Sequence, residues 1–276
     1  MTDFWSATKP LRSEFPKSTE RAAVLGFHAD RLGLAFIGGY TAAMTRLDPT
    51  LGPDELPALC ATEDQGAHPR AIKTTLSASS ITGTKRFVSG GTFATRLLVI
   101  ATEGTTPEGR NRLRLVRVDP KSPGVTLEPM PELPFVPEIP HASVTFTGAP
   151  AELLPGDGYE DALKPFRTHE DLHVHAAVLG YLLSVGRRNT WPQPVLERLL
   201  AAIVAAVGLG SADPKAPPTH LALAGLLAAG QGLLHDVDPL WAPSDERTRF
   251  ERDRPLLDVA SKAREARRAK AWERLP

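Results

Sequence analysis

The feature that most limits the possible fold is a block of short β-type runs between residues 57 and 155. These runs are rich in Val, Ile, Leu, Thr and Phe, and Gly, Pro, Asn and Ser separate them: AIKTTLSASS, KRFVSGG, TRLLVIATEG, RLRLVRVD, VTLEPM and SVTFTGA. Regularly spaced short strands with turn signals between them are typical of an antiparallel barrel or sandwich. We therefore expect an antiparallel β-domain in the middle of the chain.

Apolar residues at helical spacing flank this block on both sides. Before it, residues 21–47 predict a helical hairpin or two short helices, ended by DPTLGP, with Gly38-Gly39 allowing a close helix contact. After it, four further helices are predicted, at 168–188, 193–208, 218–236 and 244–274. The expected fold class is α+β, with a short N-terminal helical segment at 1–56, the β-domain at 57–155 and a C-terminal helical bundle at 156–276.

Local signals indicate where some of these elements begin and end. Thr168 followed by Asp171 resembles a capping box, which predicts a helix start there. Ser244 is a candidate N-cap for the last helix, and Pro255 should kink or break it. Gly90-Gly91 predicts a tight turn rather than a phosphate loop, because no G-x-G-x-x-G opens a helix.

Composition excludes several classes of function. Lys+Arg and Asp+Glu both number 32, so nothing indicates a footprint for nucleic acid or an anionic membrane. Cys60 is the only cysteine, so an internal disulfide is ruled out, which suits a reducing cytoplasm. We expect Cys60 to be a small buried apolar side chain. The apolar runs are too short to span a membrane, and the N-terminal stretch lacks the apolar core of a signal peptide.

The stretch HEDLH, residues 169–173, matches the H-E-x-x-H signature of zinc hydrolases. His169 and His173 would share one helix face, as chelation requires, and Glu197 is the one candidate third ligand of the expected kind. Glu170 has two other interpretations. A carboxylate in a first helical turn interacts favourably with the helix dipole, and an inward-facing one can act as a general base.

Four stretches in family order resemble the acyl-CoA dehydrogenases. They are LCATEDQGAHPRA (59–71), ITGTKRFVSGGTFATRLLVIATEG (81–104), SVTFTGAPAELLPGDGYEDAL (143–163) and the helix HAAVLGYLLSVGRR. The resemblance covers roughly residues 30–190. It implies a flavoprotein that oxidises an acyl-CoA or related acyl thioester to the 2,3-enoyl product, with FAD taking the β-hydride.

The resemblance also implies roles for individual residues. Thr62 and Ser89 match hydroxyl residues that meet the flavin, Phe87 and Val88 lie in the same strand, and His68 stands where the family has a serine near the thioester. For the catalytic base, counting back from Leu179-Gly180 selects Glu170, as in the isovaleryl enzymes. Counting forward from Gly158-Tyr159 selects His169 instead.

The sequence also departs from the family pattern. The R-x-x-F-G and Q-x-x-G-G-x-G motifs that help to hold the FAD pyrophosphate and adenine are absent, and the N-terminal helical segment is shortened by roughly half. An alternative is therefore a non-catalytic relative that lost FAD and serves as a binding or subunit protein, and a zinc hydrolase is the second alternative. The family further implies homo-oligomerisation through the C-terminal helices.

Overall fold

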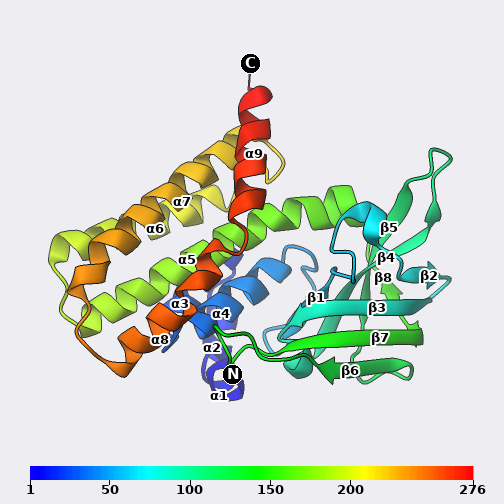
Figure 1. Ribbon diagram of the computed structural model, residues 1–276, viewed down its shortest axis with the longest axis horizontal. Coiled ribbons are helices and arrows are strands. Elements are labelled where there is room, and N and C mark those ends of the chain that lie inside the picture. Colours follow the sequence, from blue (N-terminus) through cyan, green and yellow to red (C-terminus); the bar gives the residue numbers. More distant parts are fainter. Residues whose placement is uncertain (276) are drawn as a thin grey trace. The chain divides into compact units, whose positions relative to one another are not determined.

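The computed structural model describes residues 1–275 and divides into two compact units (Figure 1). Unit 1 comprises residues 1–46, 133–138 and 167–276, and unit 2 comprises residues 47–132 and 139–166. The chain is thus a mixed α+β protein, as the sequence predicts. The three segment boundaries proposed from the sequence remain a prediction.

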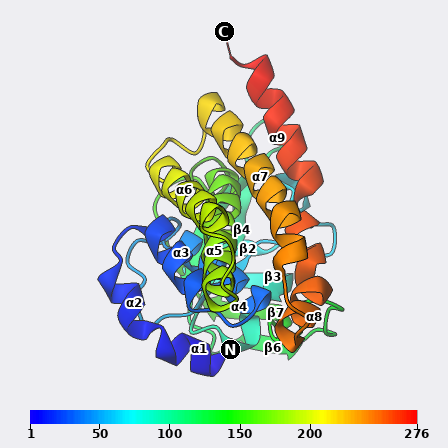
Figure 2. The same ribbon diagram turned by 90° about the vertical axis from the view of Figure 1, so that its left-hand side faces the viewer.

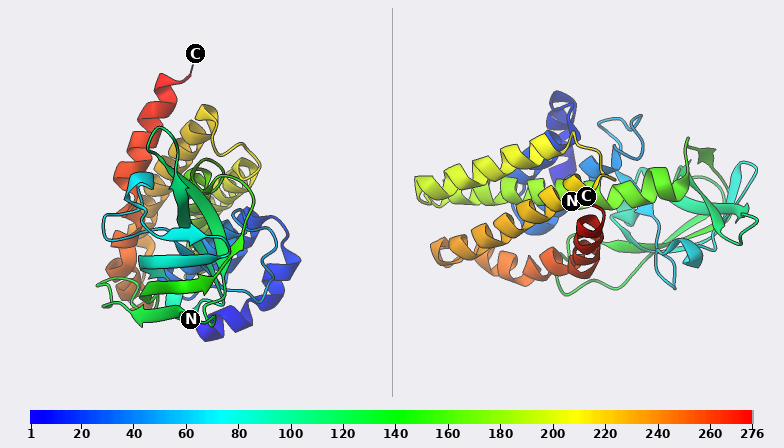
Figure 3. Two further views of the ribbon diagram at one scale, coloured as in Figure 1. Left: turned by 90° about the vertical axis from the view of Figure 1, so that its right-hand side faces the viewer. Right: turned by 90° about the horizontal axis from the view of Figure 1, so that it is seen from above.

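Unit 2 is built on one curled sheet (Figure 3, left). Its strands are β1 (Pro57–Cys60), β2 (Thr75–Ser77), β3 (Ser80–Ser89), β4 (Arg96–Thr105), β5 (Asn111–Val118), β6 (Val125–Pro129), β7 (His141–Pro150) and β8 (Glu152–Leu153). Within residues 57–153 they form an eight-stranded sheet in the order β6-β7-β3-β2-β4-β5-β8, with β1 beside β4. Inward-facing apolar residues from these strands form one core, which includes Val88, Val99 and Phe146.

The prediction of an antiparallel domain is only partly right. Most pairs are antiparallel, but β1 pairs with β4 in parallel over four positions, and β2 meets β4 in parallel at Thr75↔Thr102. A parallel pair needs a long crossover connection, and here the chain between β1 and β4 includes β2 and β3. Local residue patterns carry no information about such a non-local pairing.

The helices of unit 1 come from both ends of the chain (Figure 2). They are α1 (Thr2–Ala7), α2 (Lys9–Glu14), α3 (Ser18–Phe27), α4 (Leu32–Met44), α5 (Lys164–Arg188, from Arg167 onward), α6 (Gln193–Leu209), α7 (Pro217–Val237), α8 (Asp245–Asp253) and α9 (Ser261–Glu273). Helices α3 and α4 confirm the predicted pair of short helices. The sequence patterns did not predict α1 and α2, where Phe4 is buried.

Small residues let α3 and α4 lie close to α5. A Cβ at Gly26 would stand 1.9 Å from the Ala177 carbonyl oxygen, and one at Gly39 would stand 2.7 Å from the His173 carbonyl oxygen. The close contact predicted at Gly38-Gly39 is therefore confirmed at Gly39. Alanines and leucines of α3 to α7 form the core around this contact, including Ala23, Ala176 and Leu223.

The start of α5 differs from the prediction. The Asp157 side chain accepts hydrogen bonds from the backbone N–H groups of Tyr159 and Glu160, and a π-helical turn over Gly158–Leu163 leads into α5 at Lys164. Thr168 therefore lies inside the helix rather than at its cap. The predicted capping box is wrong, because an earlier aspartate already satisfies the free N–H groups.

The end of the chain follows the sequence signals. Ser244 accepts a hydrogen bond from the Arg247 N–H and caps α8, and the helix gives way at Arg254–Asp258 to a 3-10 turn that contains Pro255. Both predictions are confirmed. Among residues 1–275, no helix is long and apolar enough to cross a membrane.

Candidate functional site

In unit 2, a buried ion pair holds the loop that carries Thr62. Glu63 accepts hydrogen bonds from Lys85 Nζ at 2.8 Å, from the Lys73 N–H at 2.8 Å, and from the N–H and hydroxyl of Thr74 at 3.0 and 2.8 Å. Lys85 lies in the middle of β3 and is 0% exposed. These bonds fix the loop between β1 and β2 against β3.

The two charges of this pair keep each other ionised in an apolar setting. Burial acts to raise the pKa of the Glu63 carboxyl, but Lys85 and the two backbone N–H groups outweigh burial and hold that pKa below its usual value. Burial lowers the pKa of Lys85, and Glu63 opposes this shift. Neither residue stands out in the sequence, because a lysine in an alternating strand looks like a solvated one.

Strand β3 bulges directly after Lys85. Lys85 pairs with Val144 and Val88 pairs with Ala142, so Arg86 and Phe87 together oppose Ser143 alone. The bulge gives Phe87 a φ of +54° and turns its ring outward, 56% exposed, while Val88 is fully buried in the core. A positive φ at a bulky residue is strained and often occurs at a binding site.

The bulge also lies beside Thr62. The Arg86 N–H donates to the Thr62 carbonyl oxygen at 2.8 Å, and the Phe87 N–H donates to Met130 Sδ at 3.3 Å. Ser89, three residues after Arg86 in β3, lies opposite His141 of β7. The distance between Ser89 Oγ and His141 Nε2 is 3.2 Å. The strand ends at Ser89, and the φ of +69° at the following Gly90 confirms the predicted turn.

The structure therefore places the backbone of Thr62 against β3, the strand that carries the consecutive predicted residues Phe87, Val88 and Ser89. An outward aromatic ring on the same strand as the Ser89 hydroxyl suits a planar heteroaromatic ring such as that of a flavin, through stacking and hydrogen bonds. Because the Val88 side chain is buried, only its backbone is left for such a contact. The fit extends to the ring system alone, since the sequence lacks both family motifs for the rest of FAD.

His68 also belongs to unit 2, where its side chain is exposed. Its Nδ1 accepts a hydrogen bond from the Arg70 N–H at 3.3 Å, and so caps the short 3-10 turn at Pro69–Ala71. This cap explains the histidine locally. Its predicted contact with a substrate remains a prediction.

Glu170 belongs to unit 1 and lies well inside α5, six residues after Lys164. A dipole contact in the first turn therefore does not explain this carboxylate. Burial, followed by the neighbouring charge of Asp171, raises the pKa of Glu170 to about 7, although Arg167, Arg267 and Arg264 act in the opposite direction. A carboxylate with this pKa is suited to take up a proton near neutral pH.

Asp171 has a different environment. Its carboxylate forms ion pairs with Arg264, at 3.2 Å, and with Arg267, both on α9. Burial raises the pKa of Asp171, while the two arginines act to lower it. Asp171 therefore attaches the last helix to α5 and is not a helix cap.

The histidines of HEDLH serve the packing of unit 1. His173 Nδ1 lies 2.6 Å from the His169 carbonyl oxygen, and His173 Nε2 lies 2.8 Å from Ser18 Oγ, so both ring nitrogens are engaged. Burial lowers the pKa of His173 to about 3 and that of His169 to about 4. Within residues 1–275, no group of three or more His, Cys, Asp or Glu is arranged to hold a metal ion.

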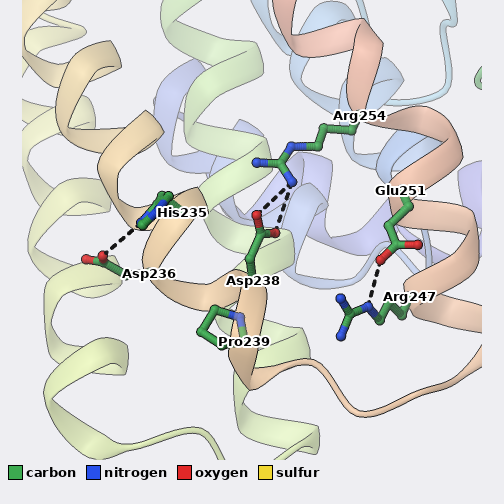
Figure 4. A pocket seen from close by; sticks show the side chains of 7 residues that line it. All are labelled: His235, Asp236, Asp238, Pro239, Arg247, Glu251 and Arg254. Carbon is green, nitrogen blue, oxygen red and sulfur yellow. Dashed lines mark hydrogen bonds and ion pairs between the residues drawn. The ribbon is translucent and has the colours of Figure 1, made fainter.

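Unit 1 also has an open cavity of about 600 Å³ at the end of α7 and along α8 (Figure 4). Its charges are matched in pairs: Arg254 donates to both oxygens of Asp238 at 3.0 and 2.8 Å, and Arg247 donates to Glu251 at 2.7 Å. No predicted site residue lines it. With its charges already paired, this cavity offers little to a ligand.

Of the comparisons with known proteins, the one with solved structures shows the fold. No family model matches the sequence, and no curated protein matches it either. Among solved structures, FMN-bound TdsC from Paenibacillus sp. A11-2 is 20% identical with a TM-score of 0.68, covering 95% of this chain and 84% of that one. Butyryl-CoA dehydrogenase from Megasphaera elsdenii is 13% identical with a TM-score of 0.67, covering 92% of this chain and 80% of that one.

A third similar structure is the acyl-CoA dehydrogenase from Geobacillus kaustophilus, which is 14% identical with a TM-score of 0.63. That match covers 90% of this chain and 81% of the other. The chain therefore has the fold of the acyl-CoA dehydrogenases and related flavin enzymes, as the four sequence motifs predict. At these identities the likeness concerns the fold.

Proposed function

We propose that the chain is a flavin-dependent oxidoreductase that oxidises an acyl thioester, such as an acyl-CoA, between its α and β carbons. The observation that carries this proposal is the bulge of β3, which turns the Phe87 ring outward directly after Arg86, whose N–H holds the Thr62 carbonyl of the loop fixed by Glu63 and Lys85. The similar structures include FMN-bound TdsC and an FAD complex of PigA, which support a flavin as the cofactor.

Each residue has a defined task in this reaction. Glu170, deprotonated above pH about 7, removes the proton α to the thioester carbonyl and becomes a neutral acid. A flavin, when bound, would supply the hydride acceptor that this oxidation to a 2,3-enoyl thioester requires. Phe87 would hold the flavin ring by stacking, Thr62, Ser89 and the Val88 backbone would offer it hydrogen bonds, and His68 would contact the thioester side of the substrate.

The first test is the flavin itself. Purified protein is expected to be yellow, or to bind added FAD or FMN with quenching of flavin fluorescence. FAD follows from the family resemblance, whereas preferential binding of FMN would fit the missing pyrophosphate and adenine motifs. A colourless protein that binds neither flavin would refute the proposal and favour the non-catalytic alternative.

The second test addresses the base. Glu170→Gln should abolish turnover while flavin binding is unchanged, and wild-type turnover should increase as pH rises through about 7, where Glu170 loses its proton. The matched control is Glu265→Gln, because Glu265 is an exposed glutamate on α9. Undiminished turnover in Glu170→Gln would remove Glu170 as the base.

We also propose that two copies of the chain associate through α6. Leu200 and Val204 are 48% and 69% exposed on this helix, and the neighbouring exposed positions Ala201, Ala205 and Gly208 are small. An exposed apolar helix face is typical of an oligomer interface.

The proposed location of the protein is the cytoplasm, and its proposed role is in fatty acid metabolism.

Oligomer size measured by light scattering tests this surface. Val204→Glu should yield a smaller species, because a carboxylate would be buried without a partner in the interface. Val259→Glu is the control, since Val259 is 70% exposed and lies outside α6. A wild-type monomer, or an oligomer unaffected by Val204→Glu, would contradict the proposal.

A further inference from the structure

Met130 supplies a hydrogen-bond acceptor to the bulge of β3. The bulge takes Phe87 out of the register between β3 and β7, and the Phe87 N–H donates instead to Met130 Sδ at 3.3 Å. Met130 is itself held by its backbone, because its N–H donates to the His141 carbonyl of β7 at 2.8 Å. The thioether therefore has a defined position against a residue whose φ is +54°.

This contact lies at the surface of unit 2. Phe87 is 56% exposed and Met130 is half-buried. The chain has two other methionines: Met44, which is 0% exposed, and Met1, the first residue. A small oxidant in solution reaches a methionine sulfur where that sulfur is accessible, so it reaches Met130 before Met44.

A thioether reacts with hydrogen peroxide by taking up one oxygen atom. A lone pair of the sulfur attacks one peroxide oxygen, an S–O bond forms, and the O–O bond breaks. The second oxygen leaves as hydroxide and takes the proton from the new S–OH group as water. The sulfur is oxidised, the peroxide is reduced, and methionine sulfoxide and water are the products.

This reaction changes the acceptor that the bulge depends on. The new bond uses a lone pair of Met130 Sδ and leaves a partial positive charge on the sulfur, which no longer attracts the Phe87 N–H. It also places a polar oxygen where an apolar thioether lay. A positive φ at a bulky residue persists only when its surroundings hold it, and Met130 Sδ is one of the groups that hold Phe87.

We propose that Met130 is a modification site, at which a peroxide oxidises the thioether and releases the bulge that presents the Phe87 ring. The oxidation and the release concern this chain alone. Their consequence for a ligand rests on the proposed function, which assigns the Phe87 ring to stacking on a flavin. Oxidation of Met130, a residue outside β3, thereby weakens flavin binding.

The selectivity of the oxidation is tested on native protein without flavin. After limited treatment with hydrogen peroxide, mass spectrometry of the peptides should find an added oxygen on Met130 before it finds one on Met44. In denatured protein, the two residues should react at the same rate. Equal rates in the native protein, or a Met130 that stays unmodified, would overturn the inference.

Release of the bulge is tested by hydrogen exchange of the Phe87 amide, measured by NMR. Oxidation should make this exchange about tenfold faster, the worth of one hydrogen bond. Met130→Leu removes the sulfur, so its Phe87 amide should exchange equally fast and peroxide should have no further effect. Met44→Leu is the matched control and should keep the full response. An unchanged Phe87 amide in oxidised protein, or an undiminished response in Met130→Leu, would refute the release.

The effect on the ligand is measured as the dissociation constant for FMN after the peroxide has been removed. Oxidised wild type should bind FMN about tenfold more weakly, because one hydrogen bond that holds the bulge is lost. The two methionine sulfoxide reductases, one for each epimer, should restore the affinity. Met130→Leu should show the same FMN affinity before and after peroxide.

Two outcomes separate this inference from the proposed function. An unchanged FMN affinity in fully oxidised wild type would overturn the inference and leave the proposed function standing. If unoxidised protein binds neither FMN nor FAD, the proposed function fails. The exchange rate of the Phe87 amide then still decides whether Met130 holds the bulge.

Discussion

Each unit of the chain contains a nearly buried carboxylate paired with cations, but the two pairs differ in what surrounds them. In unit 2, Glu63 meets a fully buried Lys85 and several N–H and O–H donors of its own loop. In unit 1, Asp171 meets Arg264 and Arg267, whose side chains remain 25% and 23% exposed. The Glu63–Lys85 pair fixes the loop between β1 and β2 and is buried. The Asp171 pairs attach α9 to α5, and their arginine side chains remain in contact with water.

Breaking the pair of unit 2 should give the largest effect. Lys85→Met leaves Glu63 buried without its cation, and we expect a loss of about 3–5 kcal/mol in the free energy of unfolding. Glu63→Gln combined with Lys85→Met should recover a large part of this loss, because no uncompensated charge remains. Denaturant unfolding measures the free energy of unfolding of the single and the double variant. If Lys85→Met were as stable as wild type, the proposed difference between the two ion pairs would be contradicted.

Glu170 provides a pH-dependent contrast within unit 1. Its pKa in the folded protein, about 7, lies above its usual value, so the native state binds the proton more tightly than the unfolded state. Its contribution to stability is therefore complete below pH about 4.5 and is lost as pH rises to about 7, up to about 3 kcal/mol. Glu170→Gln should remove this slope in unfolding experiments across that pH range, and an unchanged slope would refute the assignment.

Breaking the pair of unit 1 should cost less than breaking that of unit 2. Asp171→Asn keeps the shape of the side chain but removes its charge, and Arg264 and Arg267 can then turn to solvent. We expect a loss of about 1–2 kcal/mol, together with faster proteolysis of α9. If Asp171→Asn were as costly as Lys85→Met, exposure of the cations would not be the deciding difference.

Phe87 should give the smallest effect, with the opposite sign. Phe87→Gly relieves the positive φ of the bulge and should stabilise the flavin-free protein by about 1 kcal/mol. The same change removes the stacking ring and should weaken flavin binding. Thermal unfolding measures the change in stability, and flavin titration measures the change in flavin affinity. If Phe87→Gly were less stable than wild type, the bulge would hold no strain.

How far the sequence predicts this structure differs from one element to another. Helices α6 and α7 were predicted within a residue or two, because proline turns delimit apolar runs of helical length. The strands of unit 2 were predicted from alternation and turn residues, but the parallel pairing of β1 with β4 joins segments far apart in sequence. The start of α5 was missed, since Thr168 matches a capping signal and Asp157 precedes an uncommon π-helical turn.

Motif order predicted Thr62, Phe87 and Ser89 as site residues, and the structure adds that the Thr62 carbonyl is held by the Arg86 N–H at the bulge of β3. Glu63, Lys85 and His141 were not identified, because their roles depend on burial and on partners in other strands. A lysine in β3 or a histidine at the start of β7 looks like a surface residue in the sequence. Only the pairing of the strands gives these side chains their partners.

The burial of Cys60 has a practical consequence. Its thiol is 0% exposed within the core of unit 2, and burial raises its pKa to about 12. A thiol reagent can therefore label the native protein only when this core opens. Because the chain has no other cysteine, the rate of labelling reports the opening of the β-sheet core alone. Cys60 is thus a built-in probe for comparing the sheet's opening with and without flavin.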